Sequence, residues 1–169
     1  MKKILLVALA LLVLTVSVAA AEGEVKIGQV QYAAHGTKCF AVLTVAMQGD
    51  VIADAYIDEY QFMATGSVGV PNSEADFGAS FPEGKVLASK KVNAAQYSAN
   101  MAEKAGSTVA LDANYAAIEA FVTGKTIAEL EAAVEGKTAE EMVDAVTGCT
   151  LVDTLGYVNG LIEAAKAAQ

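Results

Sequence analysis

The sequence contains no arginine and no tryptophan, and it has only one histidine, two cysteines and two prolines. Its 11 basic residues are therefore all lysine, against 20 acidic residues and a formal net charge of −9 over 169 residues. Binding to nucleic acid depends on clustered cations that neutralise phosphates, and readout of bases depends largely on bidentate arginine. We therefore expect no nucleic acid among the partners of this protein.

The shortage of histidine and cysteine also argues against a metal centre. Cys39 and Cys149 lack the close paired spacing of a zinc site, and His35 stands in the order HGTKC, unlike the CxxCH order of haem attachment. A single histidine without a cluster of neighbouring ligands rarely binds a metal. We expect His35 to be a loop residue next to Gly36, and we assign no metal.

The N-terminus has the pattern of a secretory signal peptide. Two lysines precede an apolar run over 4–14, and the small residues Ala19–Ala21 lead to Glu22. The pattern predicts cleavage after Ala21 and an extracellular, periplasmic or cell-envelope location. The alternative is a retained membrane anchor, since the stretch 4–21 is near the lower length limit for a spanning helix. Cleavage removes two lysines and no acidic residue, which leaves 20 acidic residues, 9 lysines and a charge of −11 on a single domain, 22–169.

The first part of this domain is typical of an antiparallel meander. Residues 25–32 alternate between apolar and polar, and 39–47 form a longer apolar run. A tight turn at 48–50 then connects to a third strand over 51–58. Glycines and both prolines interrupt residues 60–91, so we expect a long loop there with one short element near 86–87.

The second part is predicted to be helical. We expect helices over 94–105, 112–121 with Asp112 as its cap, 127–134, 139–143, and from Asp153 or Thr154 onwards. Thr126 with Glu129 and Thr138 with Glu141 have the spacing of capping boxes. Strands followed by helices predict an α+β fold, in which a small antiparallel sheet packs against C-terminal helices.

One segment between two predicted helices carries an unusual number of reactive groups. Residues 144–154 read DAVTGCTLVDT, with three hydroxyls, a thiol and two carboxylates. Gly148 permits a sharp turn, and the helix that follows presents free N–H groups that can hold a phosphate without arginine. On the residues alone, a plain connection with Thr and Asp as helix caps remains the alternative.

This segment resembles the flavinylation motif of the exported FMN-binding domain family, Asp-x-x-(Ser/Thr)-Gly-Ala-(Thr/Ser). The family includes electron-transfer flavoproteins of bacterial cell surfaces and subunits of sodium-pumping quinone reductases. The resemblance implies that Thr150 forms a phosphoester with FMN, attached by a separate flavin transferase that uses FAD. Asp144, Thr147 and Gly148 then match the rest of the motif, and Cys149 stands where the family has alanine.

The resemblance implies an electron carrier with redox partner proteins or quinone-linked membrane systems, and not an enzyme with its own substrate. No Gly-x-Ser-x-Gly segment or evident partner for His35 indicates a hydrolase. Lys90 and Lys91 form the only adjacent lysine pair of the mature chain and are the candidate cations for a phosphate. The alternative is a secreted binding or structural module without flavin, in which a Cys39–Cys149 disulfide stabilises the fold.

Overall fold

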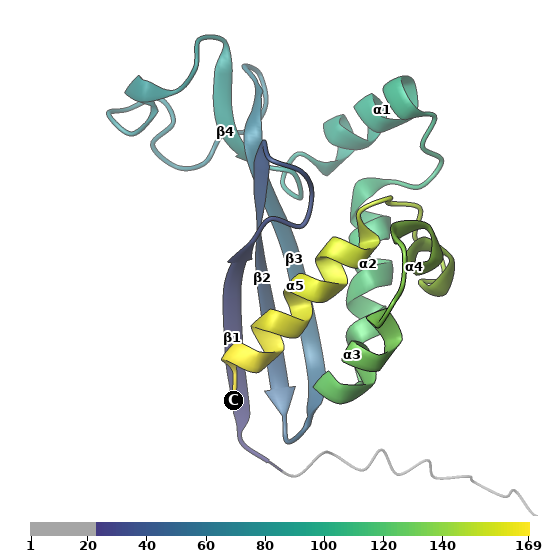
Figure 1. Cartoon of the computed structure of the whole chain (residues 1–169). Helices are drawn as coiled ribbons and strands as arrows, with labels where there is room; N and C mark the ends of the chain where they lie inside the picture. Colours follow the sequence, from purple (N-terminus) through teal and green to yellow (C-terminus); the bar gives the residue numbers. More distant parts are fainter. Residues whose placement is uncertain (1–22) are drawn as a thin grey trace, which may run out of the picture.

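The computed structural model describes residues 23–169, so the predicted signal peptide and its cleavage point lie outside the described residues. A four-stranded antiparallel sheet of order β1-β2-β3-β4 is followed by five helices, which confirms the α+β prediction (Figure 1). The strands are β1 (Val25–Tyr32), β2 (Cys39–Gln48), β3 (Val51–Ala64) and β4 (Lys85–Ser89). No helix in the described part of the chain is long and apolar enough to cross a membrane.

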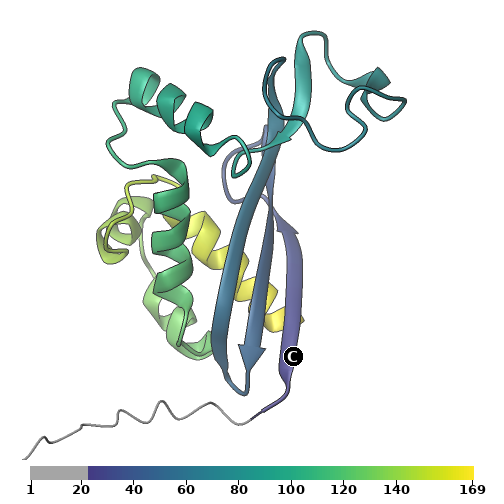
Figure 2. The same ribbon diagram turned by 180° about the vertical axis from the view of Figure 1, so that it is seen from behind.

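The predicted loop is shorter than expected because the sheet extends into it. β3 continues to Ala64, and β4 pairs with it from Tyr60↔Ser89 to Ala64↔Lys85. The loop therefore covers 65–84, with a short 3-10 turn at Gly78–Ser80. β3 and β4 extend past the helices of residues 111–167, to the end of the molecule where helix 94–105 also lies, and carry this loop (Figures 1 and 2). We call β4, loop 65–84 and the adjoining ends of β2 and β3 the projecting end.

The helices are α1 (Ala94–Ala105), α2 (Leu111–Val122), α3 (Ile127–Val134), α4 (Ala139–Ala145) and α5 (Thr154–Ala167). Both predicted capping boxes are present, at the N-termini of α3 and α4. The prediction for Asp112 was wrong: α2 begins at Leu111, so Asp112 lies inside its first turn and its carboxylate accepts from the N–H of Ala113.

The core lies between one face of the sheet and α2 and α5. Alternate residues of β2, from Ala41 to Met47, are buried on this face, as the pleat of a strand requires. On α5, the predicted apolar face is confirmed, because the following five residues are all buried: Tyr157, Val158, Leu161, Ile162 and Ala165.

Close approach of α5 to the sheet depends on glycine. A Cβ added at Gly28 of β1 would overlap the carbonyl oxygen of Ala164, and one at Gly156 of α5 would overlap that of Ala34. A Cβ at Gly160 would overlap the side chain of Leu43. Glycine at these positions lets α5 lie directly on β1 and β2, which fixes where the segment before α5 is held.

Candidate functional site

The motif residues lie on the connection between α4 and α5. Asp144 is exposed in α4, and Thr147, Gly148 and Thr150 are exposed on the connection. Gly148 has a φ of +86°, a left-handed conformation that a residue with a Cβ adopts only with strain. The turn places Thr147 and Thr150 at the surface while Cys149 between them points into the protein, only 6% exposed.

The backbone of Thr150 is held by Asn114, a buried residue that was not among the predicted site residues. Asn114 of α2 is fully buried, and its Oδ1 accepts from the backbone N–H of Thr150 at 2.7 Å. The Thr150 hydroxyl lies 3.3 Å from the same oxygen. The Asn114 amide group donates to the carbonyls of Val109 and Ala110 at 3.1 and 3.0 Å, so its orientation is fixed at both ends.

The two cysteines are free thiols with different partners. Cys149 Sγ lies 3.1 Å from the hydroxyl of Thr154, while Cys39 Sγ donates to the carbonyl of His35 at 2.6 Å. The structure therefore does not form the Cys39–Cys149 disulfide expected for the flavin-free alternative. Cys149 instead acts as a small core residue, which is the part an alanine would play at this position.

The start of α5 joins this motif to a histidine. Asp153 occupies the N-cap position, yet its side chain makes no capping hydrogen bond. One of its carboxylate oxygens lies 3.6 Å from Nε2 of His35. The histidine expected to be an isolated loop residue is therefore part of a polar cluster that reaches to within three residues of Thr150.

The centre of this cluster is a buried ion pair. Glu59 of β3 is fully buried and Lys90, just after β4, is 1% exposed; the Lys90 ammonium donates to Glu59 Oε2. The hydroxyl of Tyr157 donates to the same oxygen at 2.9 Å, and Nδ1 of His35 lies 3.6 Å from it. Glu59 Oε1 is buried and has no hydrogen-bond partner within residues 23–169. A lone charge at this depth would be very unfavourable, so each member of the pair requires the other.

The sequence predicts Lys90 and Lys91 as cations for a phosphate, but both lysines have other partners in the structure. Lys91 pairs with Glu119 of α2 at 2.9 Å, and its ammonium lies 3.8 Å from the ring centre of Tyr56. Lys90 lies 4.8 Å above the ring of Tyr97. Both lysines already have a carboxylate and an aromatic partner within the fold.

The pKa shifts agree with an ionised cluster. Burial raises the pKa of Glu59, but the nearby His35 and the hydrogen bonds from Lys90 and Tyr157 outweigh it, so that the net shift is downward. Burial lowers the pKa of Lys90, and the Glu59 carboxylate more than restores it. The nearby Glu59 carboxylate raises the pKa of His35 above its ordinary value, although burial and the Lys90 ammonium oppose this.

His35, Cys39 and Glu59 place three possible metal ligands within 4.8 Å of one another. The Lys90 ammonium, however, contacts Glu59 and lies 3.1 Å from Nδ1 of His35, so a cation already faces these two groups. Burial raises the pKa of Cys39 to about 11, which keeps the thiol protonated, whereas a metal ligand must be a thiolate. We assign no metal to this cluster.

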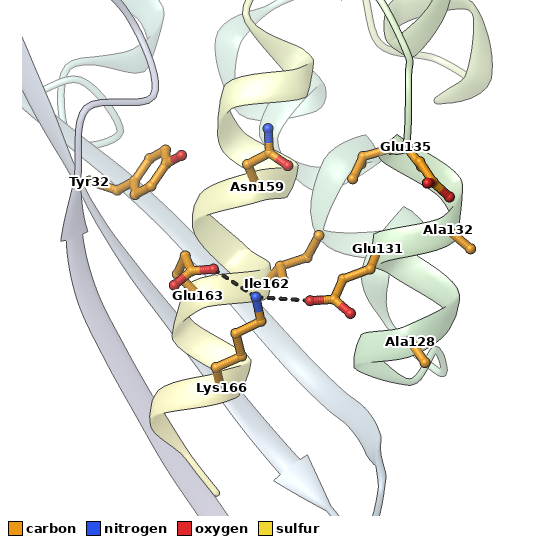
Figure 3. A pocket seen from close by; sticks show the side chains of 10 residues that line it. Tyr32, Ala128, Glu131, Ala132, Glu135, Asn159, Ile162, Glu163 and Lys166 are labelled. Carbon is orange, nitrogen blue, oxygen red and sulfur yellow. Dashed lines mark hydrogen bonds and ion pairs between the residues drawn. The ribbon is translucent and has the colours of Figure 1, made fainter.

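No protein-family model, no curated protein and no solved structure matches the chain. The functional case therefore depends on the residues themselves. A cleft of about 840 Å³ lies between α3 and α5 (Figure 3), and no residue of 144–154 lines it. Glu131, Glu135 and Glu163 line it, and Lys166 bridges two of them at 2.9 and 3.0 Å. Its excess of carboxylates makes it a poor place for a phosphate.

Proposed function

We propose that this protein is an exported electron carrier whose FMN is linked by a phosphoester to Thr150. The observation that carries the proposal is that Thr150 is exposed while its backbone position is fixed. Thr150 is exposed on a glycine turn at the start of α5, while its backbone N–H is fixed by the buried Asn114. A flavin transferase could therefore reach the Thr150 hydroxyl, which is the position at which the motif places the attachment.

The surrounding residues fit the group. Esterification removes the hydroxyl proton of Thr150 and with it the 3.3 Å bond to Asn114, but the 2.7 Å bond from the backbone N–H survives. The phosphodiester would carry one negative charge in a chain without arginine. Residues able to offset it are the N-terminal N–H groups of α5, where no side chain caps the helix, and His35 in its protonated form.

When bound, FMN supplies the redox chemistry, because its isoalloxazine ring accepts and releases electrons. The chain contributes position and local charge. Glu59, Lys90 and Tyr157 are buried beside His35, and the histidine side chain, like that of Asp153, reaches solvent. Its imidazole can gain or lose a proton near neutral pH, which suits it to balance charge beside a redox group.

The test is intact-mass analysis of the full chain exported from a host that supplies a flavin transferase. We expect one added FMN on the wild-type chain and on Thr150→Ser, and none on Thr150→Ala. Thr108→Ala is the matched control, since Thr108 is also exposed on a connection between two helices but lies outside the motif. Its FMN should be retained.

Protein that stays unmodified in this host would overturn the proposal, as would modification retained in Thr150→Ala. A second arm in a host without the transferase should give unmodified protein. Comparing Asn114→Leu with Asn114→Asp then tests whether the bond to the N–H of Thr150 positions this residue for FMN attachment. The aspartate keeps an acceptor for the N–H of Thr150, so we expect it to retain more FMN than the leucine variant at equal folded fraction.

A further inference from the structure

The projecting end carries a group of aromatic side chains on the sheet face that points away from the helices. Phe40 of β2 and Tyr60 of β3 are register partners, and their rings stack with centroids 5.6 Å apart and an interplanar angle of 18°. Phe62 lies next on the same face of β3, 42% exposed. From the loop, Phe81 packs edge-on against Phe62 at 5.3 Å. Large exposed aromatic surfaces of this kind mark binding sites on soluble proteins.

These rings line a cleft and not a flat patch. The cleft has a volume of about 640 Å³, within the range of small-molecule sites, and is bounded by Phe40, Tyr60 and Phe62 on the strands and by Pro82 on the loop. A second hollow of about 320 Å³ continues it across Tyr60 towards Phe77, which is 54% exposed. Residues of β2, β3 and the loop therefore line one cleft in which three aromatic rings offer surfaces for stacking.

The charge of the cleft is opposite to that of the protein. Lys38 and Lys85 lie at its rim, and no acidic residue lines it, although acidic residues outnumber basic ones by 20 to 11 in the chain. The cleft between α3 and α5 shows the contrast, since three glutamates and one lysine line it (Figure 3). Two lysines without a carboxylate attract an anion, and aromatic rings attract another planar ring.

We propose that this cleft binds a planar aromatic molecule that carries an anionic substituent. The ring stacks on the Phe40–Tyr60 pair and against Phe62, and the anionic group pairs with Lys38 or Lys85. The cleft shares Thr37, Lys38, Cys39 and Gln61 with a smaller cavity of about 280 Å³ at His35, so a bound molecule lies next to the polar cluster. Binding here does not depend on FMN at Thr150.

The test is calorimetric titration of the full-length Thr150→Ala chain, which carries no phosphoester, with anthraquinone monosulfonate and its neutral hydroxymethyl analogue. We expect saturable binding of the sulfonate, weakened about tenfold by Phe62→Ala, the equivalent of about 1.4 kcal/mol of lost stacking. The double variant Lys38→Gln/Lys85→Gln should weaken binding of the sulfonate and leave that of the neutral analogue unchanged.

Matched controls are Tyr56→Ala and Lys137→Gln. Tyr56 is 50% exposed on the same strand face but outside the cleft, and Lys137 is an exposed lysine elsewhere. Neither should change the affinity. Absence of saturable binding, or equal losses in Phe62→Ala and Tyr56→Ala, would overturn the proposal. Concentration-dependent dimerisation that Phe62→Ala abolishes would overturn it too, because the cleft would then be an interface between copies. Circular dichroism verifies that each variant is folded.

Discussion

Helix α5 is held to the sheet in two different ways. At Gly28, Gly156 and Gly160 it is held by close packing, because a Cβ at the first would overlap α5 itself, and a Cβ at either of the others would overlap atoms of β1, of β2 or of the connection between them. At Tyr157 and Asp153 it is held by polar groups, through the hydroxyl bond to Glu59 and the contact with His35. The glycine contacts set a distance that does not depend on pH, whereas the polar contacts depend on which groups are ionised.

The two kinds of contact therefore differ in whether a change of pH or of nearby charge can alter them. The glycine contacts involve backbone and apolar atoms, whereas the polar contacts involve Glu59, His35 and Asp153, which stands three residues after Thr150. A change of charge near the motif can therefore alter Glu59, Lys90 and His35 without changing the main packing of α5. Three variants test how far the two kinds of contact are separate.

The largest loss is expected when the buried pair loses one member. Glu59→Leu leaves the Lys90 ammonium, 1% exposed, without its carboxylate, and we expect the free energy of unfolding to fall by about 3–5 kcal/mol. Urea denaturation followed by circular dichroism measures it. The double variant Glu59→Leu/Lys90→Met should recover most of this loss.

The neighbouring pair provides the control for that experiment. Lys91, 24% exposed, pairs with Glu119, 19% exposed, so Lys91→Met should cost no more than about 1 kcal/mol. Similar losses in Glu59→Leu and Lys91→Met would mean that depth of burial does not distinguish the two pairs.

A smaller loss is expected from the glycine contacts. Gly28→Ala forces a methyl group against the Ala164 carbonyl, and the backbone on both sides must move, at a cost of about 3 kcal/mol. Gly136→Ala is the control. With a φ of +67° and no neighbouring atom within 4 Å, it should cost about 1 kcal/mol of backbone strain alone. Equal unfolding midpoints for the two variants would contradict close packing at Gly28.

The smallest effect should be a pH dependence that belongs to His35. Its pKa is raised in the folded state above the ordinary 6.5, so its contribution to stability is complete below about pH 6.5. The contribution disappears as the pH rises through the raised value. Because the side chain is 42% exposed, we expect less than about 1 kcal/mol. Unfolding measured from pH 5 to 9 should lose this slope in His35→Gln and keep it in Gly28→Ala.

Most of the helices and strands could be predicted because their signals are local. The bounds of β1 and α1, the two capping boxes and the buried face of α5 follow from alternation, helical spacing and cap residues. The short element predicted near 86–87 is confirmed as part of β4, but the sequence does not predict that β3 continues to Ala64 or that β4 covers Lys85–Ser89. Their residues stand among glycines and prolines, and only the pairing of the two strands makes them a sheet.

The candidate site was predictable only in part. Residues 144–150 were identified from their composition, but their support was not. Asn114 did leave a signal, a polar residue at helical spacing between Leu111 and Ile118, which are both buried. Nothing in the sequence indicates that Glu59 meets Lys90, because an ion pair between distant positions has no local pattern. The pair can be recognised only once the pairing of β3 with β4 is known, because that pairing brings Glu59 next to Lys90.

The contact between α5 and β1 has a consequence for how the chain reaches its native state. These two elements lie at opposite ends of the described range, so their meeting is a contact of very high sequence separation, which slows folding. The meander can pair early, yet the core cannot close until α5 has been synthesised. The bond between Asn114 and the N–H of Thr150 spans 36 residues, so it is more local than the contact between α5 and β1 and does not require that contact.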